Sequence, residues 1–162
     1  VRIVPGQNGA IHRSVASARS GDVLVVDGGA SDRFGPFGDL LADACKARGM
    51  AGAVFDCTIR DSADLAALGF QVFCRGFHPE ATAKTDPGEV DVPVTIDGVQ
   101  VLPGDIIVGD DDGVVVIPFL AAAEVLERAV EVAGREKAIR TRILAGETTY
   151  DIFGLAHSQR AT

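Results

Sequence analysis

Short apolar runs alternate with helical patterns through the first half of the chain. The runs at residues 23–26 and 53–55 contain no charged side chain, which is typical of strands covered on both faces. The segment between them has a helical pattern at residues 40–48 and ends at Gly49. Because parallel strands need such a crossover, the alternation predicts βαβ units around a parallel sheet. The same pattern predicts further helices at residues 10–19 and 62–68 and another strand at residues 71–74.

Turn-forming residues mark the ends of the other elements. Asn8 precedes the first helix, and its side chain is expected to cap that helix. Asp97 and Gly98 separate apolar runs at residues 90–96 and 99–102, which predicts a β-hairpin. A further pair of strands, at residues 105–108 and 114–117, flanks the acidic segment Asp110-Asp111-Asp112. The spacing of these acids differs from that of an EF-hand loop, so the segment is interpreted as a solvated turn.

The longest predicted helix runs from Pro118 to about Ala145. Proline is tolerated in a first turn. Acids precede arginines by one helical turn, a favourable order, at Glu124/Arg128, Glu131/Arg135 and Glu136/Arg140. An apolar stripe comprises Leu126, Ala129, Val130 and Ala133, widened by Val125, Val132, Ile139 and Ile143. The stripe either joins the core of the chain or meets a neighbouring subunit. The tail is expected to pack as far as about Leu155 and to fray over residues 156–162.

Length and composition exclude several classes of protein. A chain of 162 residues, 47% of them hydrophobic, fits one globular domain. No apolar run approaches the length of a membrane span, and no secretory signal pattern is visible. The three cysteines lack Cys-x-x-Cys spacing, which indicates reduced thiols in a cytoplasmic protein. The net charge of −8 argues against nucleic acid as a partner, because phosphate contacts require basic side chains.

A glycine-rich stretch connects the two clearest strands. Glycines occur at residues 28–29 and again within residues 35–38, directly before Asp39, which begins a helix. Arg60 and Asp61 follow the carboxyl end of the next strand. Ligands of open α/β sheets bind beyond the carboxyl ends of the strands, so this geometry allows Asp39, Arg60 and Asp61 to share one crevice. Spacing alone explains Asp39 equally well as an acid that complements the helix dipole.

This arrangement, with Asp39 behind a glycine-rich loop and ahead of Arg60 and Asp61, resembles a known family. The family contains the class II 4-hydroxy-4-methyl-2-oxoglutarate aldolases and the regulators of ribonuclease activity A, and is called RraA-like. The resemblance covers about residues 4–147 and includes Gly21-Asp22-Val23-Leu24-Val25-Val26-Asp27, Arg75-Gly76-Phe77-His78-Pro79 and Gly109-Asp110-Asp111-Asp112-Gly113-Val114-Val115-Val116-Ile117-Pro118.

The resemblance implies an architecture and an assembly. The expected fold is α/β, a three-layer β/β/α swivelling domain with a long C-terminal helix, in a single domain over residues 1–162. The expected assembly is a homotrimer or a homohexamer with sites between subunits. Members of the aldolase branch usually carry more sequence before this point, so the N-terminus is expected to be truncated.

The resemblance also implies a reaction. Its substrate would be 4-hydroxy-4-methyl-2-oxoglutarate or 4-carboxy-4-hydroxy-2-oxoadipate, cleaved to pyruvate and a second 2-oxo acid, with oxaloacetate decarboxylation as a related activity. Such a cleavage uses either a lysine Schiff base or a divalent metal. The lysine route is disfavoured because it needs a desolvated, neutral amine. The three lysines instead lie on helix faces or in a polar loop, namely Lys46, Lys84 and Lys137.

Roles for particular residues follow from the resemblance. Asp61 is implied as the ligand of a magnesium or manganese ion, Arg60 as the contact to the keto oxygen, and Asp39 as the proton acceptor. Amides at the helix start are implied to bind the substrate carboxylate, namely those of Gly38, Asp39 and Leu40. Glu136 is implied as an acid that reaches the site of an adjacent subunit. Arg33 either binds the distal substrate carboxylate or forms a surface salt bridge.

The sequence leaves other residues and another function open. Cys57 stands where relatives often have glycine, and it is expected to crowd the site. His78 is either an additional acid or base or a loop residue before Pro79. The alternative function is a non-catalytic protein that binds and inhibits a ribonuclease, with which the acidic surface is compatible.

Overall fold

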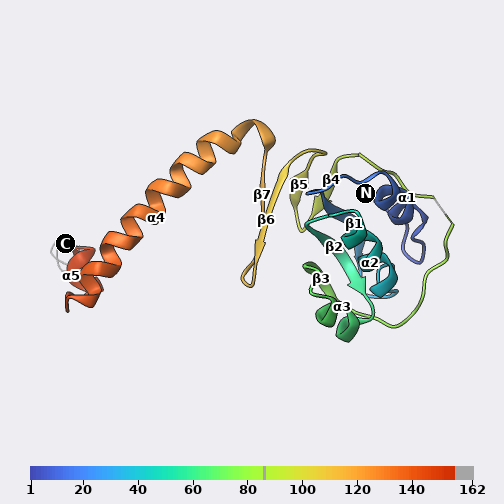
Figure 1. The fold of residues 1–162 in the computed structure, drawn as a ribbon, viewed down its shortest axis with the longest axis horizontal. Coiled ribbons are helices and arrows are strands. Elements are labelled where there is room, and N and C mark those ends of the chain that lie inside the picture. The colour runs from blue at the N-terminus through green and yellow to red at the C-terminus, as the bar shows by residue number, and fades with distance from the viewer. Residues whose placement is uncertain (86, 156–162) are drawn as a thin grey trace, which may run out of the picture. The chain divides into compact units, whose positions relative to one another are not determined.

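The computed structural model describes residues 1–85 and 87–155 of the chain. Its contacts divide the chain into two units, one from Val1 to Phe119 and one from Leu120 onward (Figure 1). The first unit contains the sheets, and the second contains the long helix.

A three-stranded parallel sheet forms the centre of the first unit. Its strands are β1 (Val23–Ser31), β2 (Gly52–Ile59) and β3 (Val72–Phe77), in the order β1-β2-β3. Both pairings are parallel, which confirms the predicted sheet and brings the carboxyl ends of the strands to one edge. Each strand extends further at this edge than its apolar run indicated. In β2 the reason is that Asp56 and Thr58 are buried with the apolar residues.

Helices α1 (Gly9–Ser17), α2 (Asp39–Ala47) and α3 (Ser62–Leu68) cover one face of this sheet. Their apolar residues form one core with those of β1 and β2. Phe37, in the loop before α2, is fully buried in this core, and its ring centroid lies 4.7 Å from that of Phe55. Burial of one such side chain contributes about 1.5–3 kcal/mol. The loop that precedes α2 is therefore anchored from inside.

Two hairpins form the layer on the other face of the sheet. They pair β4 (Val94–Ile96) with β5 (Val99–Val101) and β6 (Ile106–Asp110) with β7 (Gly113–Ile117). A cavity of about 570 Å³ lies between the layers and is lined by residues of all seven strands. The order of layers is therefore β/β/α, as expected. The predicted turn between β6 and β7 is also confirmed, since Asp110 accepts a 2.9 Å hydrogen bond from the Asp112 amide.

Two local expectations are wrong. The strand expected over residues 90–96 begins only at Val94, because Pro93 has no amide to donate and Asp91 has a positive φ of 55°. The Asn8 side chain does not cap α1. It is buried and instead donates a 2.9 Å hydrogen bond to the carbonyl oxygen of Pro36, in the glycine-rich loop.

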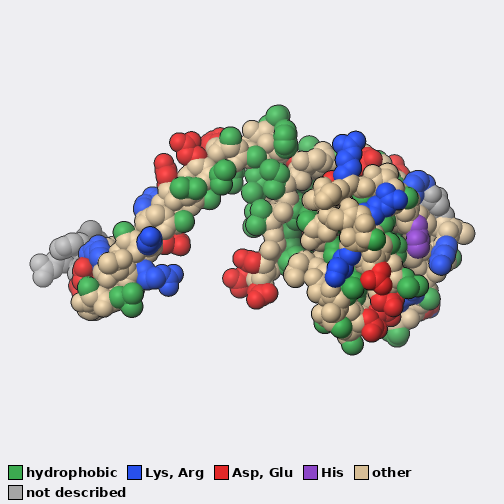
Figure 2. Space-filling model, in the orientation of Figure 1, with side chains coloured by type: hydrophobic (Ala, Val, Ile, Leu, Met, Phe, Trp, Pro, Cys, Tyr) green, Lys and Arg blue, Asp and Glu red, His purple; other side chains and the backbone are tan. Residues whose placement is uncertain are grey.

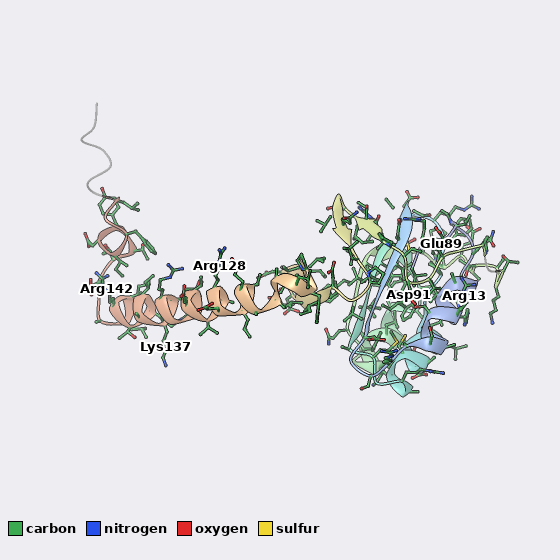
Figure 3. All side chains as sticks on the ribbon, turned by 90° about the horizontal axis from the view of Figure 1, so that it is seen from above. Arg13, Glu89, Asp91, Arg128, Lys137 and Arg142 are labelled. Atoms are coloured by element: carbon green, nitrogen blue, oxygen red, sulfur yellow. The ribbon has the colours of Figure 1, made fainter. Side chains whose placement is uncertain are left out.

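The second unit is helical. After the short turn η1 (Phe119–Ala121), α4 spans Ala122–Leu144 and α5 spans Thr149–Ile152. Apolar side chains lie along α4, and within the second unit none of its residues is buried (Figure 2). Both alternatives for its apolar stripe, the core of the chain and a neighbouring subunit, stay predictions. Arg128, which is paired with Glu124 at 2.6 Å, and Lys137 project from different sides of the helix (Figure 3).

Residues 156–162, for which fraying was expected, lie outside the described residues. Within the part of the chain that the structure describes, no helix has the length and apolar content needed to cross a membrane.

Candidate active site

Two glycines allow the loop before α2 to lie against the end of β2. A Cβ atom at Gly35 would lie 2.7 Å from Arg60 Cβ and 2.7 Å from the carbonyl oxygen of His78. A Cβ atom at Gly38 would lie 2.1 Å from Asp61 Oδ2. All three distances are far below a van der Waals contact, so only glycine permits this approach. The sequence predicted that these segments meet, and the structure brings them together.

Asp61 is the residue on which the other groups converge. Its Oδ2 atom accepts hydrogen bonds from Arg60 Nε at 3.2 Å and from the Asp39 amide at 3.3 Å. Its backbone has a left-handed conformation, with φ 61° and ψ 41°, at the N-cap of α3. Non-glycine residues in this region are uncommon and are concentrated at functional sites. The side chains of Arg60 and Asp61 are about one-third exposed, so a ligand from solvent can reach them.

Asp39 is the first residue of α2 and follows Gly38, whose backbone is extended. Asp39 Oδ1 accepts a 2.7 Å hydrogen bond from the Leu40 amide. The predicted carboxylate-binding amides of Asp39 and Leu40 therefore already have partners within the protein. A substrate carboxylate has to share or displace these two hydrogen bonds.

The groups that remain available fit an anionic substrate and a divalent cation. Among the described residues, the terminal nitrogens of Arg60 and the Oδ1 atom of Asp61 form no hydrogen bond within the protein. No group of three or more His, Cys, Asp and Glu side chains in the described ranges is arranged to hold a metal ion. Magnesium is commonly bound through one or two carboxylates, with waters and substrate oxygens completing its shell. Asp61 alone satisfies that requirement.

Arg33 lies in the same loop but is already paired. Its Nε and Nη2 atoms donate to the two carboxylate oxygens of Glu80, at 2.8 and 3.0 Å, and its guanidinium lies 5.0 Å from the centre of the Phe34 ring. These hydrogen bonds raise the pKa of Arg33 and lower that of Glu80. The structure thus shows the surface salt bridge that was one of the two alternatives for Arg33.

Two further residues that the sequence singled out are Glu136 and Cys57. Glu136 is an exposed residue of α4, in the second unit, and its expected role in the site of an adjacent subunit stays a prediction. Cys57 is buried in the helix-side core, and a Cβ atom at Gly28 would lie 2.6 Å from its sulfur. Glycine at position 28 therefore makes room for this cysteine. Burial raises the pKa of the Cys57 thiol to about 12, so the sulfur is protonated at neutral pH.

Sequence reasoning missed the polar side chains that hold the glycine-rich loop. Asn8 binds Pro36, while Thr58 and His78 bind the backbone of Phe34. Each is a polar residue within or beside an apolar element. A polar residue in such a place signals a buried hydrogen bond, but the sequence does not show which distant residue is its partner.

The fold and the site together define an α/β protein with an acid–arginine–acid cluster at the carboxyl edge of a parallel sheet. A model of the RraA-like family, described as Aldolase/RraA, matches residues 1–116. The chain belongs to this family.

Individual relatives agree with this assignment. A protein of Halalkalibacterium halodurans, provisionally named 4-hydroxy-4-methyl-2-oxoglutarate aldolase, is 38% identical over 149 residues, which cover 90% of this chain and 71% of the relative. An uncharacterised protein of Methanocaldococcus jannaschii is 42% identical over 119 residues, or 74% of this chain and 57% of the relative.

Solved structures of relatives share the fold. Streptomyces coelicolor RraAS2, described as an unusual member of the RNase ES inhibitor RraA protein family, has a TM-score of 0.75 and 37% identity, over 82% of this chain and 68% of that one. The RNA-processing inhibitor RraA of a Thermus species has a TM-score of 0.68 and 35% identity, over 72% of this chain and 71% of that one.

Proposed function

We propose that the chain is a divalent-metal-dependent aldolase. Its substrate would be 4-hydroxy-4-methyl-2-oxoglutarate or 4-carboxy-4-hydroxy-2-oxoadipate, cleaved to pyruvate and a second 2-oxo acid. Oxaloacetate decarboxylation is the related activity, since both reactions leave negative charge on the same pyruvate fragment. The observation that carries the proposal is the convergence of Asp39 and Arg60 on Asp61 at the carboxyl edge of the sheet. The aldolase name of the Halalkalibacterium relative supports it.

Each residue of the cluster has a role in this proposal. Asp61 would hold a magnesium or manganese ion, which when bound supplies a Lewis acid. Arg60 would donate hydrogen bonds from its free terminal nitrogens to the keto oxygen, where negative charge develops as the carbon–carbon bond breaks. Asp39 would accept the proton of the C4 hydroxyl. The Gly38 end of α2 would bind the substrate carboxylate, because a helix N-terminus favours anions.

Two further residues extend the site. Arg33 would exchange Glu80 for the distal carboxylate of the substrate, since both partners present the same bidentate acceptor. Glu136 would act from the α4 helix of an adjacent subunit in a homotrimer or homohexamer. The apolar residues along α4, among them Leu126 and Val130, support such an assembly. The protein would work in the cytoplasm, where its three cysteines, all free in the structure, stay reduced.

Pyruvate release tests the proposal. Turnover of 4-hydroxy-4-methyl-2-oxoglutarate and of oxaloacetate is expected with magnesium or manganese, and it is expected to vanish with a chelator. Asp61→Asn is expected to lower kcat/KM by at least about a hundredfold, which the metal does not restore. Asp64→Asn, a nearby change in the first turn of α3, is the matched control and is expected to retain activity. Full turnover by Asp61→Asn would contradict the assignment.

The second candidate is a non-catalytic inhibitor that binds a ribonuclease. Two structural relatives favour it, because the Thermus protein is described as an RNA-processing inhibitor and the Streptomyces protein as an unusual member of the RNase ES inhibitor RraA family. An absence of metal-dependent turnover on either substrate, together with saturable binding to a purified RNase E-type enzyme, would replace the aldolase proposal with this one.

A further inference from the structure

Phe34, beside the site, has a backbone conformation that is rare for an aromatic residue. Its φ is +76°, in the left-handed region. An aromatic residue is strained there, because its Cβ atom crowds the backbone. Such a conformation persists only when neighbouring groups hold it in place.

Two side chains hold the two backbone groups of Phe34. The Phe34 amide donates to Nδ1 of His78 at 3.3 Å, and the Phe34 carbonyl oxygen accepts from the Thr58 hydroxyl at 2.8 Å. Thr58 is buried in β2, the central strand of the sheet. The strained residue is thus fixed to the rigid part of the fold.

The Nδ1 atom of His78 joins two loops. Besides the hydrogen bond from Phe34, it accepts one from the Glu80 amide at 3.2 Å. The His78 amide in turn donates to the Ile59 carbonyl oxygen at 2.8 Å. A nitrogen that accepts two N–H groups carries no hydrogen of its own, so the hydrogen of the neutral ring is on Nε2. His78 therefore acts here as an acceptor through Nδ1.

The held residue lies directly before the loop that forms the site. Gly35 follows Phe34 and lies against Arg60 and the His78 carbonyl oxygen. Three residues further on, Gly38 lies against Asp61. A change in the backbone of Phe34 would therefore move both glycines away from the Arg60–Asp61 pair.

We propose that His78, together with Thr58, is a positioning residue that holds Phe34 in its left-handed conformation and so sets the glycine-rich loop against Arg60 and Asp61. The effect on turnover rests on the proposed function. His78 acts through the loop and exchanges no proton with the substrate.

Side chains that place an acceptor at one ring position or the other test this role. The oxygen of asparagine can occupy the position of Nδ1, whereas that of glutamine occupies the position of Nε2. His78→Asn is expected to keep kcat/KM within about threefold of wild type, whereas His78→Gln and His78→Ala are expected to lose about tenfold or more, since hydrogen bonds to the loop are lost. Equal loss in all three variants would overturn the proposal, because none of these side chains replaces an imidazole acid or base.

A measurement without substrate separates this proposal from the proposed function. Hydrogen exchange of the Phe34 and Glu80 amides is expected to accelerate by about tenfold or more in His78→Ala and His78→Gln, and to stay near wild type in His78→Asn. Amides of β2 serve as the control for intact folding. Thr58→Val, which removes the hydroxyl, is expected to loosen the same loop, and Thr58→Ser is expected to preserve it. Unchanged exchange in His78→Ala would overturn the proposal, whereas a wild-type chain without turnover would overturn only the aldolase function.

Discussion

Gly38 has no side chain at the point where the Asp61 carboxylate approaches α2, and the local geometry leaves room for none. The Oδ2 atom of Asp61 would lie 2.1 Å from a Cβ atom built there. Asp61 Oδ2 also accepts hydrogen bonds from the Asp39 amide and from Arg60 Nε. A methyl group at position 38 therefore has to displace the carboxylate on which the site converges.

Gly38→Ala is expected to lower activity by about a hundredfold, the cost of a displacement of roughly 1 Å in an active site. Steady-state pyruvate release checks this. Asp64→Asn, in the first turn of α3 and outside the cluster, is again the control. The control is expected to keep full activity. Equal activity of the two variants would show that the Gly38 contact is not needed.

The cysteines allow a prediction from acidity. Burial raises the pKa of Cys57 to about 12 and that of Cys45 to about 11. Since the thiolate is the reactive form, a raised pKa leaves little of it at pH 8, and burial also blocks access. Cys74, which is half-buried, is expected to react first with iodoacetamide at pH 8.

Mass spectrometry of peptides after timed labelling checks the order of reaction. In denaturant the three thiols lose their different surroundings, so similar rates are expected. Fastest labelling of Cys57 in the native protein would contradict its burial against Gly28.

At the scale of elements, the parallel sheet brings the residues of the site to one edge. The glycine-rich loop follows β1, Arg60 and Asp61 follow β2, and His78 follows β3. Parallel strands place these three connections at one edge, the usual position of ligand sites in such sheets. The sequence predicted the first two contributions from spacing. The third depends on how the loop after β3 folds back onto Phe34.

The long helix allows a prediction about assembly. Leu126 and Val130 are each 65% exposed on α4, although they belong to its apolar stripe. If the stripe meets a neighbouring subunit, Leu126→Glu is expected to shift the solution mass toward that of one chain, because the interface would bury an unpaired charge. Light scattering coupled to gel filtration measures this mass.

Arg135→Glu is the control for this change, because it adds an acid on the opposite side of α4. It is expected to leave the mass of the assembly unchanged. A wild-type mass equal to one chain would exclude the assembly.

At the scale of the whole molecule, the charge limits the partners. The net charge is −8, and a chain that binds nucleic acid relies on basic side chains for its affinity. Single-stranded RNA is therefore expected to bind no more tightly than about 10⁻⁴ M at physiological salt. Fluorescence anisotropy of a labelled oligonucleotide measures this, and saturable binding at micromolar concentration that weakens with salt would contradict it. If RNA does not bind, a link to RNA processing has to pass through a protein partner.

Local information in the sequence determined the elements and the family. Apolar periodicity, glycine stops and turn residues predicted the parallel strands, the hairpins and the long helix. The spacing of Asp39, Arg60 and Asp61 was compatible with a meeting at one edge of the sheet, and the resemblance to the family turned this into a prediction. These features depend on neighbouring residues and on the regular geometry of strands and helices, so a single sequence reveals them.

Only the tertiary structure decided which side chains meet. Asn8 holds Pro36 instead of capping its helix, Glu80 occupies Arg33, and His78 fixes Phe34. These partners are separated by between 28 and 47 residues. Packing of Phe37 and the close approach of the loop glycines bring them together. A hydrogen bond between distant segments leaves no periodic trace in the sequence, because it forms only after the core has fixed the distance between them.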